Sequence, residues 1–411
     1  MKASKQKNME AGDMEARRLR TPQEYLDAQK ISTIAFVGSC DMTKAPEKIE
    51  EERKKNEGSV EYWGFFNDEG VMTSHMMNNL YHILYDGRIV LSGGVGNVSS
   101  LPEYRRQGGI REIFRAKFAD MRQRGFVFSA LYPFSHEYYR KFGYEFCYAP
   151  MRQRFRVEDL KIFSCPYTVR MHQSGECIQP FKDVYQRFIL GQNMAIVRSE
   201  TQWDWIEGDP YKDRMYRYLL SDGQEAHAYA VIRAEGMGEE RKAVLKDFAY
   251  DSREAFFGLL GFLYRLSAQY KYIEAVFPSD IDMRILLPEP YRVDQEIATH
   301  GMFRVVDVPR ALTLMSHPAG SGRYTIGVQD DFLPENTGVY AVAFENGAAV
   351  SVERTDAPAD LSVNVTTLAQ LTLGYAPLDT LAYRSDVRIN GNLDVLRSVF
   401  VRKNCYFADY F

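Results

Sequence analysis

Hydrophobic and polar positions in the first third of the chain alternate in a pattern that predicts strands and helices in one mixed layer. Residues 21–36, "TPQEYLDAQKISTIAF", begin with a Thr-Pro helix start and continue with apolar residues at helical spacing. Residues 60–77 predict two strands that are joined by a turn at residues 67–70. Residues 88–101 predict a further strand, and an apolar stripe of helical period follows Gly109.

Three more elements complete this layer. Residues 126–134 predict a strand, residues 135–142 a short helix, and residues 144–151 another strand. Because strands and helices alternate around one hairpin, we expect an α/β fold for this part of the chain.

The middle third of the chain repeats part of this order. Residues 243–251 predict a strand, residues 253–270 an amphipathic helix, and residues 271–280 a strand that resembles residues 126–135. Two explanations are open, a true internal repeat or the convergent packing of one strand-helix-strand unit.

The composition changes near residues 317–324, "HPAGSGRY", which predicts a linker or loop. Alternating strands with turn signals follow, and residues 361–375 and 392–401 add a strand and two helices. This part is expected to be α+β with an apolar face.

Composition and charge narrow the class of protein. A chain of 411 residues is typical of two or three domains. The formal net charge of −4 and the pI of about 6.1 argue against nucleic acid or a membrane as a partner. We expect a cytoplasmic protein, because the N-terminus lacks the apolar core of a signal peptide and no 18 apolar residues run together. The cysteines form no CxxC pair and predict neither a disulfide framework nor a metal site; they are Cys40, Cys147, Cys165, Cys177 and Cys405.

The loop between the strand at 88–101 and the following helix has the features of an anion site. Gly108 and Gly109 stand at a predicted helix N-terminus, where backbone N–H groups and the helix dipole favour a phosphate. Arg105 and Arg106 add positive charge. The alternative is a tight turn with solvated arginines. Neither GxxxxGK[ST] nor GxGxxG occurs at this helix, so other nucleotide loops fit less well.

The stretch "SSLPEYRRQGGI" resembles the coenzyme A pyrophosphate loop of the GNAT acetyltransferases, whose pattern is PxxRxxGxG/A. Pro102, Arg105 and Gly108 match this pattern, whereas Ile110 departs from it. Together with "ALYPFSHEYYRKFGYE" (residues 130–145), the loop resembles the enhanced intracellular survival (Eis) acetyltransferases.

This resemblance implies a domain plan for almost the whole chain. Residues 1–15 are polar and are expected to be mobile. After them the resemblance implies a catalytic GNAT domain (16–155), a degenerate second GNAT-like domain (156–300) and a C-terminal domain of sterol carrier protein type (301–411). The expected fold is therefore tandem mixed-sheet α/β domains followed by an α+β domain, and the internal repeat gains an explanation. The resemblance also implies a homo-oligomer, a hexamer, for which the apolar face of the third domain would suit an interface.

The resemblance also implies which residues bind acetyl-CoA. A strand pairs with the pantetheine arm, and the loop holds the pyrophosphate. The residues are Val98 and Ser100 on the strand, and Arg105, Arg106, Gly108 and Gly109 on the loop.

Tyr139 occupies the position of the general acid, four residues before Gly143 in "YYRKFGY". A phenol with a pKa near 10 stays protonated at neutral pH and can supply a proton to the leaving thiolate. Without the motif, aromatic packing would be the simpler interpretation of this residue. With it, Tyr139 is favoured over Tyr138.

The base is expected at the end of the chain. The resemblance places the terminal carboxylate of Phe411 in the active site, where it could deprotonate an ammonium group directly or through water. A frayed tail is the usual alternative, but the apolar sequence "YFADYF" favours a docked one. Glu103 and His136 are the other candidates for the base.

We therefore predict an N-acetyltransferase that transfers acetyl directly to a primary amine, on an aminoglycoside-like polyamine or a lysine side chain. No cysteine lies in the motif, so a covalent acyl-enzyme has no support. The alternative is a lipid or acyl-CoA carrier that uses the C-terminal domain, with "LAQLTLGY" and "LRSVFV" as the apolar wall.

Overall fold

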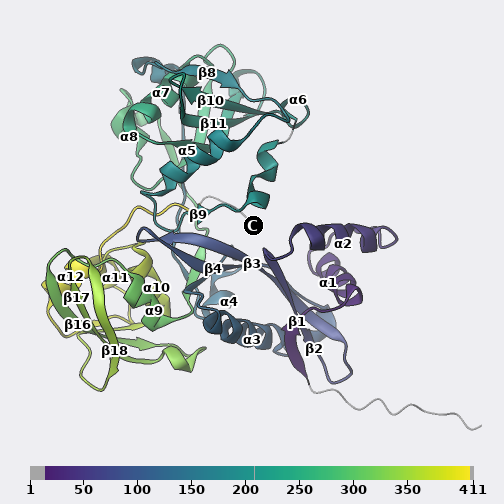
Figure 1. Cartoon of the computed structure of the whole chain (residues 1–411), viewed down its shortest axis with the longest axis vertical. Helices are drawn as coiled ribbons and strands as arrows, with labels where there is room; N and C mark the ends of the chain where they lie inside the picture. The colour runs from purple at the N-terminus through teal and green to yellow at the C-terminus, as the bar shows by residue number, and fades with distance from the viewer. Residues whose placement is uncertain (1–13, 208, 408–411) are drawn as a thin grey trace, which may run out of the picture.

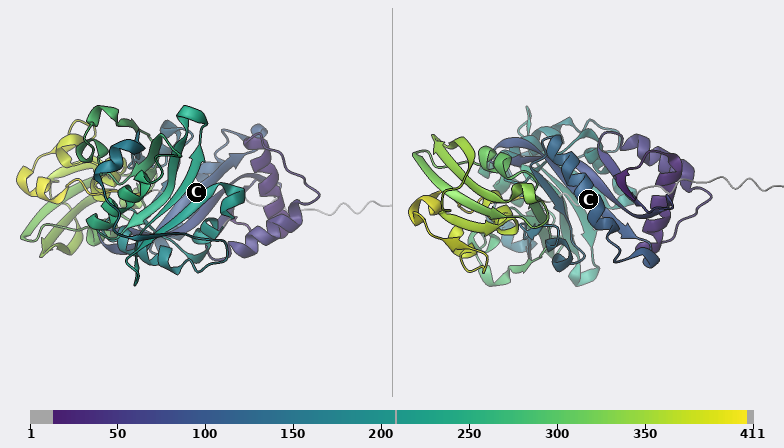
Figure 2. Two further views of the ribbon diagram at one scale, coloured as in Figure 1. Left: turned by 90° about the horizontal axis from the view of Figure 1, so that it is seen from above. Right: turned by 90° about the horizontal axis from the view of Figure 1, so that it is seen from below.

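The computed structural model describes residues 14–207 and 209–407, which form three β-sheets covered by helices (Figure 1). Residues 1–13 of the expected mobile segment and Phe411 lie outside the described residues. The third domain and the helices α1 and α2 lie at opposite ends of the molecule (Figure 2).

The first sheet has eight strands, in the order β1-β2-β3-β4-β5-β15-β6, with β9 paired to β3. Its strands are β1 (Glu15–Arg18), β2 (Val60–Phe66), β3 (Met72–Tyr85), β4 (Arg88–Ser100), β5 (Phe128–Leu131), β6 (Glu145–Phe146), β9 (Ile196–Val197) and β15 (Met302–Val305).

Helices cover both faces of the β1-β4 part of this sheet. Helix α3 (Gly109–Gln123) packs its apolar stripe on Trp63 and Phe65. Helix α1 (Pro22–Ala35) packs on the other face, against Phe66, and begins with a capping box in which Thr21 and Glu24 satisfy each other's backbone N–H groups. Two further helices belong to this domain, α2 (Ala45–Lys55) and α4 (His136–Arg140).

The second sheet has the order β14-β7-β13-β12-β11-β10-β8. Side chains of β11 alternate between the two faces, so Tyr229 and Val231 contact the layer of α5 while Ala230 and Ile232 contact that of α7. Its elements are β7 (Met151–Arg156), β8 (Thr168–Met171), α5 (Gln179–Ile189), α6 (Pro210–Asp213), β10 (Met215–Ser221), β11 (Ala226–Glu235), β12 (Lys242–Tyr250), α7 (Arg253–Tyr264), β13 (Tyr272–Phe277), α8 (Met283–Leu286) and β14 (Asp294–Ile297).

The internal repeat is visible in the pairing of the strands. In the first domain β4 and β5 are parallel and joined through α3, and in the second domain β12 and β13 are parallel and joined through α7. Both units are strand-helix-strand crossovers, which explains why their sequences share a pattern.

The third sheet has the order β18-β17-β16-β19-β20. Its elements are α9 (Val308–Leu314), β16 (Ser321–Gln329), β17 (Gly338–Glu345), β18 (Ala348–Thr355), β19 (Leu361–Asn364), α10 (Val365–Leu373), α11 (Leu378–Leu381), β20 (Arg388–Ile389) and α12 (Leu393–Val399). Its core is continuous with the first domain, because Leu368 and Leu396 belong to the same buried cluster as Phe128 and Phe303. The apolar face expected from the sequence is therefore covered within the chain.

Two short segments next to the expected domain boundaries at 155 and 300 belong to the sheet of a different domain than expected. Residues 151–156 form β7, which pairs with β13 and β14 in the second sheet. Residues 302–305 form β15, which inserts between β5 and β6 of the first sheet. Sequence pattern alone could not show this, because a short apolar strand carries no signal of its partner.

Candidate active site

Strands β4 and β5 separate partway along the first sheet. Their parallel pairing runs from Ser92↔Phe128 to Val95↔Leu131, and β4 then continues to Ser100 without β5. Among the described residues, β4 beyond Val95 pairs only with β3. The second edge of this strand is thus open to an extended ligand, which could pair with it as an added strand.

A bulge in β4 lies at the start of this open edge. Asn97 has a φ of 53°, and the register with β3 shifts between His75 and Met77. Ser32 of α1 donates a hydrogen bond to Asn97 Oδ1 (2.9 Å), and its Oγ lies 2.5 Å from His75 Nε2. Burial lowers the pKa of His75 to about 4, so the ring is neutral at pH 7. Sequence reasoning did not find this support, since its three polar residues come from three separate elements.

The predicted strand residues lie along the open edge. Val98 is half-buried and contacts the cluster that contains Tyr139. Ser100 pairs with Ser74 of β3, and their hydroxyl oxygens are 2.7 Å apart.

The loop after β4 forms the predicted anion cradle at the N-terminus of α3. Gly108 is the N-cap, has a φ of 93°, and makes no side-chain cap. The first N–H groups of the helix, those of residues 109–111, have no acceptor in the described part of the chain. Such N–H groups, together with the helix dipole, favour an anion.

Glycine is favoured at positions 108 and 109 for two different structural reasons. No protein atom lies within 4 Å of the position of a Cβ on Gly108, but its positive φ favours glycine. A Cβ on Gly109 would lie 2.7 Å from Ser74 Oγ and 3.0 Å from Phe65. Gly109 therefore allows α3 to pack closely on β2 and β3.

Positive charge surrounds the cradle. Arg105 and Arg106 are exposed, as is Arg111 on the first turn of α3, and none of the three forms an ion pair with a described residue. Glu103, a candidate base, is also exposed, in the short 3-10 helix Pro102–Tyr104. The unpaired arginines are suited to bind phosphate oxygens.

Tyr139 lies in α4 with its ring in the core beneath this loop. It is 3% exposed, and its ring contacts Phe134, Phe114 and Tyr144. Its hydroxyl makes no hydrogen bond with a described residue, and burial raises the pKa of the phenol. The phenol is therefore protonated at pH 7 with its proton available to a ligand.

The neighbours of Tyr139 on α4 differ from it in burial and in contacts, although the ring of Tyr138 touches that of Tyr139. Tyr138 is half-buried and lies against Phe134 and Phe142. His136 contacts the ring of Phe146, on the side of the sheet where the third domain packs.

The turn after α4 is fixed by a residue that sequence reasoning missed. Gly143 has a φ of 79°, and a Cβ there would overlap the guanidinium of Arg304. Arg304, from β15, is fully buried; it donates hydrogen bonds to the carbonyl oxygen of Phe142 and to Asp330 of the third domain. The motif glycine thus makes room for an ion pair that connects the two domains.

A buried polar chain lies on the inner side of Tyr139 and was also not foreseen. Lys117 of α3 donates to Ser129 Oγ (3.2 Å), and Ser129 Oγ lies 2.7 Å from the hydroxyl of Tyr144. Burial lowers the pKa of Lys117 well below its ordinary value. The sequence did carry a signal of this buried chain: Lys117 lies on the apolar stripe of α3, where an ionisable side chain must find a buried partner.

The described end of the chain is docked next to this region. Phe407 is 1% exposed, and its ring stacks on Tyr132, the residue after β5, at a centroid distance of 5.7 Å. It also contacts Phe303 and Tyr148. The expected role of Phe411 lies outside the described residues, but the segment that leads to it is packed on the first sheet.

Two further searches concern metals and membranes. No group of three or more His, Cys, Asp or Glu residues suited to hold a metal ion occurs within 14–207 and 209–407. In the same ranges, no helix combines the length and the apolar character needed to cross a bilayer.

Comparison with family models identifies all three parts of the chain. Residues 17–147 match an acetyltransferase (GNAT) domain, residues 194–305 match a second acetyltransferase (GNAT) domain, and residues 308–408 match a sterol carrier protein domain. The predicted fold class and domain order are confirmed by these matches. A search of curated proteins found no match.

Solved structures share the whole arrangement. A probable N-acyltransferase from Enterococcus faecalis V583 has a TM-score of 0.83 at 23% identity, covering 97% of this chain and 100% of that chain. A GCN5-related N-acetyltransferase from Anabaena variabilis has a TM-score of 0.83 at 19% identity, with the same coverage. Eis1 from Mycobacterium abscessus has a TM-score of 0.81 at 20% identity, again with 97% and 100% coverage. At these identities the likeness is one of fold.

Proposed function

We propose that this chain, whose residues 17–147 and 194–305 match GNAT acetyltransferase domains, is an Eis-like enzyme that transfers acetyl from acetyl-CoA directly to a primary amine. The observation that carries the proposal is the meeting of three features at one end of β4 and β5. These are the open edge of β4, the cradle at residues 105–111, and the buried ring of Tyr139.

The acyl donor fits the residues that are present. The backbone of Val98 and Ser100 offers an unpaired edge to the pantetheine arm, and the free N–H groups and unpaired arginines of the loop offer partners to the pyrophosphate. Acetyl-CoA would supply the activated acyl group. The protein would hold the pantetheine arm of acetyl-CoA between the diverging strands and its pyrophosphate on the loop.

Tyr139 is proposed as the general acid. The amine nitrogen forms a bond to the acyl carbon, the carbon-sulfur bond breaks, and the phenol gives its proton to the departing sulfur. Burial favours this role, since the raised pKa of Tyr139 keeps the phenol protonated until the thiolate forms.

The carboxylate of Phe411 is proposed as the base that removes the proton of the ammonium group. Phe407 is fixed on Tyr132, and four further residues reach at most about 14 Å. A carboxylate within that radius of Phe407 could reach the end of β5, the strand that precedes the helix of Tyr139. Glu103 and His136 fit less well, because one is exposed in the loop and the other faces Phe146.

The acceptor class proposed is a polyamine of the aminoglycoside type or a lysine side chain, since a carboxylate base acts on an ammonium substrate. The structurally similar protein from Enterococcus faecalis is a probable N-acyltransferase, which supports an amine acceptor. We also propose a cytoplasmic homo-oligomer. Its interface would need a surface other than the apolar faces of the helices of the third domain, because these faces are buried within the chain.

The structure argues against the alternative function of a lipid or acyl-CoA carrier, because the apolar segments that suggested it are buried. The apolar residues of "LAQLTLGY" and "LRSVFV" pack in the core between the first and third domains, as Leu368, Leu371, Leu396 and Val399 show. These four side chains therefore form no free wall for a lipid.

A thiol-release assay tests the proposal. Acetyl-CoA is incubated with the chain and a panel of amines that includes an aminoglycoside, a linear polyamine and a lysine peptide, and free coenzyme A is measured. Amine-dependent release with a matching acetylated product is expected. Release that is equal with and without every amine would contradict direct transfer.

A further inference from the structure

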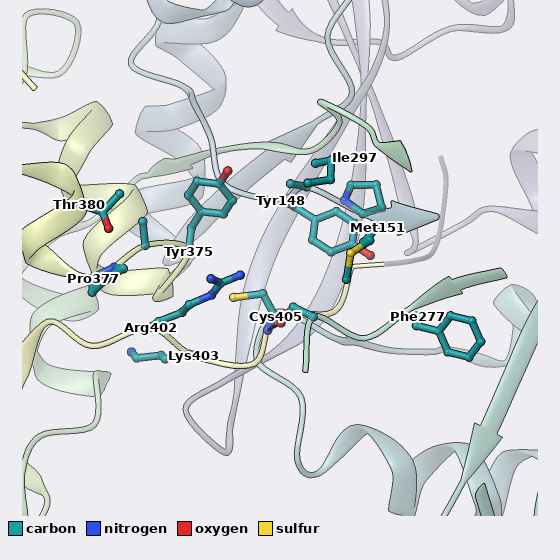
Figure 3. Close-up of a pocket in the computed structure, with 14 residues that line it drawn as sticks. Tyr148, Met151, Phe277, Ile297, Tyr375, Pro377, Thr380, Arg402, Lys403 and Cys405 are labelled. Atoms are coloured by element: carbon teal, nitrogen blue, oxygen red, sulfur yellow. Dashed lines mark hydrogen bonds between the residues drawn. The ribbon is translucent and has the colours of Figure 1, made fainter. Parts of the chain in front are cut away.

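A cavity of about 290 Å³ lies where the three domains meet, apart from the acetyl-CoA cradle (Figure 3). Its lining comes from the link between the first two sheets, from the second domain at Phe277 and Ile297, from the α10–α11 loop of the third domain, and from residues 402–405 near the end of the chain. The volume is close to the lower end of the usual range for small-molecule sites, roughly 300 Å³.

Most of the cavity wall is apolar. Ile297, at the end of β14, is 67% exposed, so part of this wall has no protein partner. The apolar and aromatic lining residues are Tyr148, Ala149, Pro150, Met151, Phe277, Ile297, Tyr375, Ala376 and Pro377.

Arg402 is the charged group that faces this wall. Its side chain points between Tyr375 and Cys405 into the cavity (Figure 3). Arg402 makes no ion pair with a described residue, and no aspartate or glutamate occurs among the residues of the lining. Its charge acts on both neighbours, opposing the burial that raises the pKa of Cys405 to about 12 and that of Tyr375.

Lys403, the second cation of the lining, already has partners within the protein. Lys403 Nζ lies 2.7 Å from Asp86 Oδ2 and 2.8 Å from the carbonyl oxygen of Thr372. Among the described residues of the lining, Arg402 is therefore the positive charge without an ion pair.

The segment that carries Arg402 is held in place by the second domain. Ser279 Oγ donates to Asn404 Oδ1 (2.9 Å), and the N–H of Cys405 donates back to Ser279 Oγ (3.2 Å). The N–H of Asn193 donates to the carbonyl oxygen of Asn404 (2.7 Å). The cavity is therefore preformed on one side, which lowers the entropy that a ligand would lose on binding.

We infer that this cavity binds an aliphatic monocarboxylate, with the carboxylate on Arg402 and the chain along the apolar wall. One arginine matches one negative charge and can bind a carboxylate through two parallel hydrogen bonds. The aliphatic chain would cover apolar surface that is otherwise exposed, Ile297 included. The site is separate from the core of the third domain and does not depend on the proposed acetyl transfer.

Calorimetric titration of the full chain with decanoate tests this site, with coenzyme A present at saturation to occupy the cradle. We expect one equivalent of decanoate per chain. Arg402→Gln should weaken binding at least tenfold, which is about 1.4 kcal/mol. The matched control is Arg323→Gln, because Arg323 on β16 is also exposed and without an ion pair among the described residues. The neutral 1-decanol should bind more weakly than decanoate by a similar factor.

A second variant tests the location without touching the charge. Thr380 is exposed on α11 and lines the cavity, so Thr380→Trp should fill its mouth and abolish binding. Thr313→Trp, at an exposed position of α9, is the control and should bind normally. Thermal melts check that all variants fold. Wild-type affinity in Arg402→Gln or in Thr380→Trp, or no binding by the unmodified chain at millimolar decanoate, would overturn the inference.

Discussion

At the scale of single residues, Tyr139 combines two properties that rarely occur together. Its ring is packed on Phe114 and Phe134, so the side chain has a fixed position, yet its hydroxyl is not used by any described residue. A free hydroxyl on a fixed ring is the geometry that a proton donor to a ligand requires.

Tyr139→Phe should therefore reduce turnover without reducing affinity for acetyl-CoA. The ring and its packing remain, while the proton donor is lost, a change that typically lowers the rate about 10²- to 10⁴-fold. Steady-state kinetics and calorimetry measure the two effects separately. Tyr138→Phe is the matched control, since Tyr138 adjoins Tyr139 on α4 and shares its contact with Phe134 but is only half-buried. Equal losses of affinity and turnover in Tyr139→Phe would make the residue a binding group only.

Gly108 is the second residue whose role can be separated from stability. Gly108→Ala introduces strain at a φ of 93° and places a Cβ beside the N–H groups of α3. Coenzyme A affinity should fall at least tenfold by calorimetry, about 1.4 kcal/mol. Gly70→Ala provides the control: its φ is 76°, its Cβ would also meet no protein atom, and it lies in the β2-β3 turn. If both variants bind coenzyme A as the unmodified chain does, the cradle is not the pyrophosphate site.

At the scale of elements, helices α3 and α7 show what distinguishes the two related domains. The N-terminus of α3 is capped by Gly108 and has no side-chain cap, whereas Ser252 accepts a hydrogen bond from the N–H of Ala255 at the start of α7. The adjoining Asp251 carboxylate is paired with Arg187 and His227. At α7, one of the helix N–H groups is already bonded to Ser252, and the nearby carboxylate of Asp251 repels a phosphate.

We therefore expect one coenzyme A per chain. Calorimetric titration gives the stoichiometry, and Gly108→Ala should reduce the affinity of that single site. A double change of Asp251 and Ser252 to alanine serves as the control and should leave the titration as it is. Two equivalents in the unmodified chain would show that α7 also holds a coenzyme.

The same comparison explains how much of the site could be predicted from sequence. The loop from Pro102 to Gly109 is contiguous, so its residues, spacing and position between a strand and a helix are all readable along the chain. The supporting residues are not. Arg304 bonds to Phe142 across 162 positions, and Ser32 meets His75 across 43. No local pattern encodes such pairs, because tertiary packing creates them.

At the scale of the whole molecule, the three domains are connected by strands and side chains that cross between them. Strand β15 completes the first sheet from a position after the second domain, and Arg304 on that strand pairs with Asp330 of the third. The final described segment returns from the third domain to the first, where Phe407 stacks on Tyr132. These crossings are why the expected domain boundaries and the sheets differ, and they fix Phe407 beside the end of β5.

A short C-terminal extension tests whether the end of the chain is catalytic. The extension leaves every side chain in place, converts the Phe411 carboxylate into a neutral amide, and moves the new terminus away from the site. Turnover should collapse, while the melting temperature and coenzyme A affinity, which depends on the loop at 105–111, should change little.

The same extension at the N-terminus is the control and should leave turnover unaffected. The buried contacts of Tyr406 and Phe407 anchor the tail upstream of the modified end, so the extension should not undock it. This separates loss of the carboxylate from loss of the fold. Equal turnover in the extended and unmodified chains would make the tail structural, and the base would then be sought at Glu103, which is exposed beside the cradle, before His136, which faces Phe146.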